Sequence, residues 1–250
     1  MDFWFFNNDK TLKKAGLLDN MTDFHSHLLP VNDEGIPDID EAVSILRQYH
    51  HFGIRKVWLT PRISATTVDT MNEWQRIFDE LRQQHLNDKA IKGERIDIRL
   101  SSLNIIDETF QERLKKQKFI PFLDSSNHIL IGTHGSKEPQ GIMTDIQAIK
   151  DAGYKPVFVS PERCFYMDTK FYSQLRKHLD VKLLLDLPSL TGLYGPEAMK
   201  RAKMLLDANY YTYIGSDNHG MRKFYAAITE YKIESKYINK LKELRDKSVF

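Results

Sequence analysis

Short apolar runs alternate with longer amphipathic stretches along almost the whole chain. The short runs carry many β-branched and aromatic residues, which is typical of strands buried in a parallel sheet. Strands are expected at Thr22–His25, Lys56–Thr60, Asp97–Ser101, His128–Thr133, Pro156–Ser160, Lys182–Leu187 and Tyr211–Gly215. Helical patterns follow at Asp38–Phe52, Thr67–Leu86, Asp107–Lys116, Met143–Ala152, Thr169–His178, Pro196–Asn209, Met221–Tyr231 and Tyr237–Lys247. About seven strand–helix units predict an α/β fold with one barrel-like parallel sheet.

The composition is that of a globular protein with one large domain. The chain has 250 residues, of which 41% are hydrophobic. A net charge of +2 with 28% charged residues indicates a mixed surface and does not predict nucleic-acid binding. The single cysteine, Cys164, excludes an intrachain disulfide and fits a reducing compartment, so we expect a cytoplasmic location. No apolar run is long enough to span a bilayer, and the aromatic Met1–Phe6 lacks signal-peptide features.

Two clusters of metal-ligand residue types lie far apart in the chain, each at the end of a predicted strand. The first cluster contains His25, His27, Asp33 and Glu34, and the second contains Asp217 and His219. Parallel strands in a barrel bring their carboxyl ends to one face, which is where such folds place ligands. Imidazole and carboxylate groups together suit a divalent metal such as zinc, manganese or iron. The two clusters therefore predict one shared metal site.

Other segments extend these clusters into a pattern that covers nearly the whole chain. They are Thr22–Gly35, Gly53–Pro61, Ile106–Phe110, Gly153–Val157, Pro161–Arg163, Pro188–Gly195 and Gly215–His219. In this order they resemble the PHP (polymerase and histidinol phosphatase) superfamily, and within it the bacterial tyrosine-protein phosphatases of capsular polysaccharide systems. The resemblance implies a distorted (β/α)₇ barrel. We expect this barrel to form a single domain over residues 21–250, after an N-terminal extension of residues 1–20.

The resemblance also implies a catalytic site with two or three divalent metals (Mn, Zn, Fe or Mg), on which hydroxide attacks the phosphorus of phosphotyrosine. Five residues match the family's ligands: His25, His27, Glu34, Asp217 and His219. Arg163 matches the arginine of a His-Pro-Glu-Arg motif and would hold the phosphate, for which a bidentate guanidinium is well suited. The implied partner is a tyrosine-phosphorylated protein, for example a kinase of the polysaccharide system.

Three expected ligands are replaced in this chain. Arg62 stands where the family has the histidine of Thr-Pro-His, Ser160 stands where it has the histidine of His-Pro-Glu-Arg, and Leu103 aligns with a metal-bridging glutamate. Arginine does not deprotonate to bind metal, and leucine has no donor atom. We therefore expect at most two metals and reduced activity. Arg62 either marks a decayed position or supplies a fixed cation in the space of a lost metal, where with Arg163 it would neutralise the phosphoryl group.

Each of these residues also has a structural interpretation. His25 and His27, at the tip of a predicted strand, fit buried and hydrogen-bonded core positions. Asp33 and Glu34 fit a loop or the cap of the next helix. Arg163 fits a structural ion pair with Glu162 or another carboxylate. Cys164 lacks the glycine-rich phosphate loop of cysteine phosphatases, so we expect it to pack and not to act as a nucleophile. His134 follows a predicted strand and is either a solvated loop residue or a neighbour of the site.

Two functions from different classes remain at this point. The first is a metal-dependent phosphotyrosine-protein phosphatase with reduced activity. The second is a catalytically inactive PHP protein that binds a phosphorylated partner or another anion without hydrolysing it. A small phosphate ester as substrate has little support in the sequence. The sequence does not predict the oligomeric state.

Overall fold

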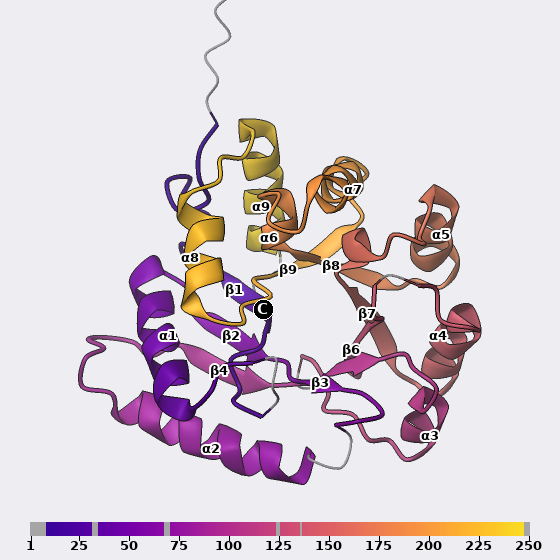
Figure 1. The fold of residues 1–250 in the computed structure, drawn as a ribbon, viewed down its shortest axis with the longest axis horizontal. Coiled ribbons are helices and arrows are strands. Elements are labelled where there is room, and N and C mark those ends of the chain that lie inside the picture. Colours follow the sequence, from indigo (N-terminus) through magenta and orange to yellow (C-terminus); the bar gives the residue numbers. More distant parts are fainter. Residues whose placement is uncertain (1–8, 32–34, 68–70, 124–125, 136, 248–250) are drawn as a thin grey trace, which may run out of the picture.

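The computed structural model of the chain describes residues 9–31, 35–67, 71–123, 126–135 and 137–247. Its strands are β1 (Thr22–Ser26), β2 (Lys56–Leu59), β3 (Arg62–Ile63), β4 (Asp97–Leu100), β5 (Leu103–Ile105), β6 (His128–Gly132), β7 (Lys155–Val159), β8 (Lys182–Asp186) and β9 (Tyr211–Gly215). The strands form an inner ring, and the helices lie outside it (Figure 1).

The helices follow the strands in the predicted alternation. They are α1 (Ile39–Phe52), α2 (Met71–Asn87), α3 (Phe110–Lys115), α4 (Ile142–Asp151), α5 (Thr169–Ser173), α6 (Leu187–Leu190), α7 (Pro196–Asp207), α8 (Met221–Thr229) and α9 (Ser235–Lys247). A 3₁₀ turn covers Pro161–Arg163, and a π-helical turn over Gln174–His178 continues α5. Helix α1 begins where Asp38 accepts a hydrogen bond from the Glu41 amide and ends at Gly53, whose φ of 92° suits glycine.

All described strands pair in parallel. One sheet has the order β1-β2-β4 and the other has β3-β5-β6-β7-β8-β9. Two-residue breaks separate β2 from β3 and β4 from β5, so each pair forms two parts of one barrel strand. The ring closes where β9 meets β1: the His27 amide donates to the Asn218 carbonyl (3.0 Å), and the Ser216 amide donates to the His25 carbonyl (3.1 Å). The predicted seven-unit parallel barrel is therefore confirmed.

Aromatic side chains fill the interior of the barrel. Phe24, Trp58, Phe122 and Tyr213 are all buried, and the Phe122 ring centroid lies 5.0–5.7 Å from those of the other three. Phe122 comes from the segment before β6 and pairs with His128, the first residue of that strand, so it enters at the amino-terminal end of the barrel. These aromatic side chains fill the amino-terminal end of the barrel, and the pocket forms at the other end, at the carboxyl ends of the strands.

Three sequence expectations differ from the structure in detail. The strand expected over Lys182–Leu187 ends at Asp186, because Pro188 in the first turn of α6 favours a helix start. The strands β3 and β5 were not predicted, because each is only two or three residues long. The helix expected over Asp107–Lys116 begins at Phe110, because Asp107 instead accepts a hydrogen bond from the Thr109 amide.

The segment before β1 packs on the domain. Leu12 and Leu17 are fully buried, and the Lys10 amide donates to the Ile233 carbonyl between α8 and α9. The expected division into an extension of residues 1–20 and a barrel of residues 21–250 stays a prediction. No helix among the described residues is long and apolar enough to cross a membrane.

Candidate active site

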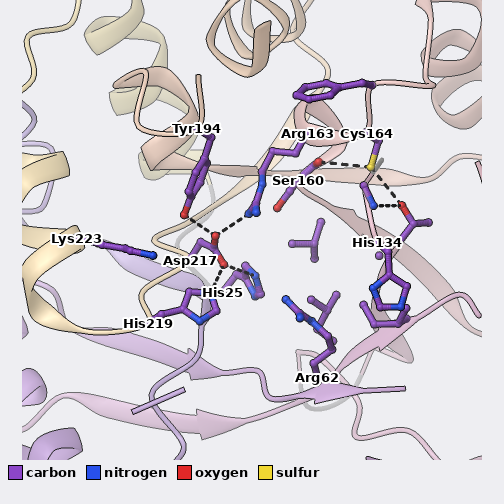
Figure 2. A pocket seen from close by; sticks show the side chains of 17 residues that line it. His25, Arg62, His134, Ser160, Arg163, Cys164, Tyr194, Asp217, His219 and Lys223 are labelled. Atoms are coloured by element: carbon purple, nitrogen blue, oxygen red, sulfur yellow. Dashed lines mark hydrogen bonds and ion pairs between the residues drawn. The ribbon is translucent and has the colours of Figure 1, made fainter. Parts of the chain in front are cut away.

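The pocket at the carboxyl ends of the strands has a volume of about 730 Å³. Figure 2 shows its side chains, which come from several strands, from the loops that follow strands, and from helix α8. Its polar and charged lining includes His25, Arg62, His134, Ser160, Arg163, Tyr194, Asp217, His219 and Lys223. The sequence clusters around His25 and Asp217 thus meet in one pocket, as their positions at strand tips predicted.

His25 lies on β1 with its ring held in one orientation. Its Nδ1 atom is 2.7 Å from the Thr60 hydroxyl, and that hydroxyl donates to the Ser26 carbonyl at 3.1 Å. This contact holds the ring so that its Nε2 atom points toward Asp217, where it lies 3.4 Å from Oδ1.

Three imidazole rings surround the same carboxylate oxygen. The Nε2 atoms of His25 and His27 are each 3.4 Å from Oδ1 of Asp217, and that of His219 is 3.1 Å away. The rings of His27 and His219 stack, with centroids 4.0 Å apart. We call these three histidines and the Asp217 Oδ1 atom the histidine corner. Asp217 has a φ of 48°, an uncommon conformation for a residue that is not glycine and one often found at functional sites.

The histidine corner fits a divalent metal. His27 is buried, its Nε2 atom makes no hydrogen bond, and burial lowers its pKa to about 3, so the ring is neutral. The Nε2 atom of His25 faces the same carboxylate oxygen at 3.4 Å, so both groups could serve one metal ion as ligands. Among the described residues, ligand atoms of His25, His27 and Asp217 lie within 4.8 Å of one another. Imidazole and carboxylate groups suit zinc, manganese or iron.

Arg163 lies on the other side of Asp217. Its Nη1 atom donates to Oδ2 of Asp217 at 2.7 Å and to Oδ2 of Asp186 at 3.3 Å, and its guanidinium carbon is 4.2 Å from the Tyr194 ring centroid. Burial works against the charge of Arg163, but Asp217 and Asp186 outweigh it and raise the pKa further above the usual range. The Arg163 side chain is still 40% exposed, so it can also reach a ligand in the pocket.

Ser160, which stands where the resemblance implied a histidine ligand, has a structural role in this chain. The Ser160 hydroxyl donates to Asp186, which is fully buried at the end of β8. Next to Ser160, the buried Glu162 accepts hydrogen bonds from the Asp186 amide, the Ser189 hydroxyl and the Tyr211 hydroxyl. Burial, followed by the neighbouring carboxyl group of Asp186, raises the pKa of Glu162, and burial raises that of Asp186 as well. These bonds join the turn after β7 to the end of β8, to Ser189 of α6 and to Tyr211, the first residue of β9.

Arg62 and Leu103 lie opposite each other on β3 and β5 and both line the pocket. In Figure 2 the Arg62 side chain extends into the pocket from the side opposite Arg163. Leu103 is 5% exposed and presents only methyl groups where the family resemblance implied a carboxylate. The two substitutions therefore stand side by side and change one wall of the site.

Other predicted residues have simpler outcomes. Glu34 and its alternative Asp33 lie outside the described residues. Cys164 is buried, and its burial raises the pKa of the thiol to about 11, which disfavours a nucleophilic thiolate. His134 is exposed and lines the pocket, so it is both a loop residue and a neighbour of the site.

Three residues near the site were not singled out from the sequence. Tyr194 donates to Oδ2 of Asp217 at 2.6 Å, Asp186 pairs with Arg163, and Lys223 of α8 lines the pocket. The position of Asp186 at the end of a predicted strand was the available signal, because strand ends in barrels carry functional residues. Lys223 had no such signal, because it lies on an amphipathic helix among other charged residues.

A buried network behind the site holds β1 and β9 in register. Asp23 accepts hydrogen bonds from the Ser216 amide (2.8 Å), the Ser216 hydroxyl (2.5 Å) and the Tyr49 hydroxyl (3.1 Å). Asn218 donates to Tyr49 at 3.0 Å. Asp23 and Ser216 lie two residues or fewer from His25 and Asp217, so the network fixes the backbone that carries the histidine corner.

Comparison with known proteins agrees with this geometry. Residues 21–243 match the family described as "Capsular polysaccharide synthesis, CpsB/CapC". The chain belongs to the CpsB/CapC family. The tyrosine-protein phosphatase YwqE of Bacillus subtilis (strain 168) is 27% identical over 232 residues, which cover 88% of this chain and 87% of YwqE. The putative tyrosine-protein phosphatase CapC of Staphylococcus aureus is 23% identical over 212 residues, covering 80% of this chain and 78% of CapC.

A solved structure supports the family's fold for this chain. It is described as YwqE from Bacillus subtilis and CpsB from Streptococcus pneumoniae, "unique metal-dependent tyrosine phosphatases". It superposes with a TM-score of 0.71 and 19% identity, covering 90% of this chain and 91% of that one. The fold predicted from the resemblance, a distorted PHP-type barrel, is thus confirmed together with the family.

Proposed function

We propose that this CpsB/CapC chain is a metal-dependent phosphatase that hydrolyses phosphotyrosine in a partner protein. The observation that carries this proposal is the histidine corner, where three imidazole nitrogens meet one carboxylate oxygen in a pocket lined by two arginines. The related proteins YwqE and CapC, named as a tyrosine phosphatase and a putative one, support the substrate class. We further propose that the partner is a kinase of the polysaccharide system and that the protein is located in the cytoplasm.

His25, His27, Asp217 and His219 would hold the metal, with Glu34 as a further ligand. A bound divalent metal would supply Lewis-acid charge and a water of lowered pKa. The chain's own residues orient this chemistry: the Thr60 hydroxyl holds the His25 ring so that its Nε2 atom points toward Asp217. The exposed part of Arg163, with Arg62 opposite, would bind the phosphoryl oxygens and neutralise their charge as it develops.

We propose that hydrolysis is slower than in family members with the complete ligand set. Arg62, Leu103 and Ser160 replace three groups that the resemblance assigns to metal ligands, and in this structure Ser160 instead donates to Asp186. Fewer metals leave less positive charge to stabilise both the attacking and the leaving oxygen. We propose at most two bound metals, of which the ligand types favour zinc, manganese or iron.

The test measures phosphate release from a phosphotyrosine peptide in the presence of Mn²⁺ or Zn²⁺. We expect slow turnover that EDTA abolishes and that His27→Gln also abolishes. The triple variant Arg62→His, Leu103→Glu and Ser160→His should hydrolyse the peptide at least about tenfold faster, since each tenfold needs only about 1.4 kcal/mol of transition-state stabilisation. The single variant Arg62→His should stay slow.

Two results would contradict this proposal in different ways. If the unaltered chain releases no phosphate with any metal but binds the peptide, the protein is a binding module. If the unaltered chain is as fast as the triple variant, the three replacements do not impair the chemistry. A matched phosphoserine peptide serves as the control for the substrate class, and it should be a poorer substrate than the phosphotyrosine peptide.

A further inference from the structure

Phe165 is a large apolar side chain that lies exposed at the pocket. It lines the pocket and is 49% exposed. The branched aliphatic side chains of the lining, Leu103, Ile105 and Val159, are at most 5% exposed. An apolar surface can contact a ligand only where it is accessible. Among the described lining residues, Phe165 therefore offers a ligand far more apolar surface than these three do.

The backbone of Phe165 is fixed on both sides of the residue. Its amide donates to the Gly135 carbonyl (3.3 Å), and its carbonyl accepts from Nη2 of Arg201 (3.1 Å). The guanidinium carbon of Arg201 also lies 5.6 Å from the Phe165 ring centroid, within the range of a cation–π contact. Arg201 is itself held by Glu197 (2.7 Å) and by the Met167 carbonyl (2.5 Å). Isolated exposed apolar residues are common on proteins, but this one is preorganised at a pocket, which lowers the entropic cost of ligand binding.

Phe165 follows the candidate phosphate-binding arginine by two residues. The 3₁₀ turn after β7 ends at Arg163, whose side chain is 40% exposed and lines the pocket. Cys164, between the two, is buried, and its Sγ atom lies 3.4 Å from the Thr133 hydroxyl. One short segment thus presents a guanidinium group and an aromatic ring to the same pocket. Phosphotyrosine carries a phosphoryl group on a flat ring, so its two parts match these two side chains.

We propose that Phe165 binds the phenyl ring of the phosphotyrosine substrate while Arg163 binds its phosphoryl group. This inference rests on the proposed function and deepens it, because it names the side chain that selects an aromatic phosphate ester over an aliphatic one. Two aromatic rings attract each other in offset or edge-to-face arrangements. Phe165 takes no part in breaking the phosphorus–oxygen bond, so its loss weakens substrate binding and leaves the chemical step unchanged.

The first test measures binding and does not depend on hydrolysis. Calorimetry with Mn²⁺ present compares two peptides of one sequence. The first carries phosphonomethyl-phenylalanine, a phosphotyrosine analogue in which a carbon replaces the bridging oxygen and prevents hydrolysis. The second carries the corresponding phosphonate analogue of phosphoserine. Phe165→Ala should bind the aromatic phosphonate about tenfold more weakly, because an aromatic contact and buried apolar area are lost. Its affinity for the aliphatic phosphonate should change by less than about twofold, because no ring contact is lost.

Control variants separate the ring contact from general effects on the protein. Phe165→Tyr keeps the ring and should bind the aromatic phosphonate as the unaltered chain does. Tyr225→Ala removes an aromatic side chain of α8 that is 47% exposed and is not among the described residues lining the pocket, so it should change neither affinity. If Phe165→Ala does not fold, Phe165→Gln replaces it, because a polar side chain of similar length suits an exposed position. The same selective loss is expected.

The second test follows phosphate release from the phosphotyrosine peptide. Phe165→Ala should raise KM about tenfold and leave kcat within about twofold of the unaltered chain, the pattern of lost uniform binding. A folded Phe165→Ala or Phe165→Gln protein that binds the aromatic phosphonate as tightly as the unaltered chain would overturn the inference. An equal loss of affinity for both phosphonates would also overturn it, because Phe165 would then only support the backbone around Arg163.

Failure of this inference and failure of the proposed function give different results. If the unaltered chain releases no phosphate but Phe165→Ala selectively loses the aromatic phosphonate, the proposed function is contradicted and the role of Phe165 in binding stands. If phosphate release from phosphotyrosine depends on metal but KM is unchanged in Phe165→Ala, the proposed function stands and the inference about Phe165 is wrong.

Discussion

At the scale of single residues, Asp217 lies between a group of imidazole nitrogens and a guanidinium group. The Thr60 hydroxyl holds the His25 ring in place, and burial keeps His27 neutral, while the Nε2 atoms of both rings point toward Asp217. On the opposite side, Arg163 supplies a charge that does not titrate in the physiological range. The identity of a few residues at neighbouring strand tips thus gives the two oxygens of Asp217 different surroundings.

His128 gives a prediction at this scale, far from the pocket at the amino-terminal end of β6. It is 5% exposed, and its Nε2 atom has no hydrogen-bond partner. Burial, followed by the charges of Lys182 and Lys155, lowers its pKa to about 4. Between pH 6.5 and 4 the unfolded chain therefore binds a proton at this residue that the folded chain does not, so the free energy of unfolding falls as the pH falls.

The predicted size of this effect is at most about 3 kcal/mol, since each pKa unit corresponds to about 1.4 kcal/mol. Urea unfolding at pH 7 and pH 4.5 measures it. The variant His128→Gln should lose less stability between these values than the unaltered chain does. Equal losses in the two proteins would show that His128 does not contribute to the acid sensitivity.

Among the structural elements, the seam between β1 and β9 determines the geometry of the site. Asp23, Tyr49 and Ser216 join the two strands by buried hydrogen bonds. Gly215, the last residue of β9, lets the strands approach closely: a Cβ atom there would lie 2.5 Å from Cβ of His25 and 3.1 Å from the His25 amide nitrogen. Glycine is needed at this position because a Cβ atom would clash with the backbone of His25, which cannot move without displacing β1.

We predict that Gly215→Ala separates β9 from β1 and displaces His25 from Asp217. The free energy of unfolding should fall by about 2–3 kcal/mol, the usual cost of overpacking, and the affinity for Mn²⁺ should fall with it. Gly132→Ala at the end of β6 is the matched control, because the nearest atom to its Cβ would be a Leu103 methyl carbon at 3.2 Å, the end of a flexible side chain. Calorimetric titration that gave both variants the same metal affinity would contradict the role of Gly215.

At the scale of the whole molecule, periodicity predicted most of the barrel but not its interruptions. The runs around Phe24 and Tyr213 are apolar enough to be identified as strands. The short strands that carry Arg62 and Leu103 depend on neighbours far away in sequence, and so does the insertion of Phe122 into the barrel. Local patterns do not contain that information.

In the site, too, some features could be predicted from local sequence and others depend on residues far apart in the chain. The meeting of the strand-tip histidines with Asp217 could be predicted, because strand ends of a parallel barrel lie at one face. The pairing of Arg163 with Asp186 could not, because it joins the ends of two strands through side chains whose sequence context is also compatible with an ordinary core. Long-range ion pairs of this kind become visible only when the barrel is assembled.

The closure of the barrel gives the last prediction, which concerns the stability of the entire fold. The three-stranded and six-stranded sheets meet at the β1–β9 seam, and the histidine corner takes its ligands from both sides of this seam. A metal bound there would join the two sheets and stabilise the folded state over the unfolded one. At a free metal concentration of 100 times the dissociation constant, the gain is about 2.7 kcal/mol. For a chain of this length, this corresponds to a rise in Tm of roughly 5–10 °C.

Thermal unfolding of metal-free protein, with and without added Mn²⁺ or Zn²⁺, measures the shift. EDTA should reverse it, and His27→Gln should reduce it strongly because it removes a ligand from the seam. A Tm that does not respond to metal, or one that rises equally in His27→Gln, would show that metal bound at this seam does not stabilise the fold.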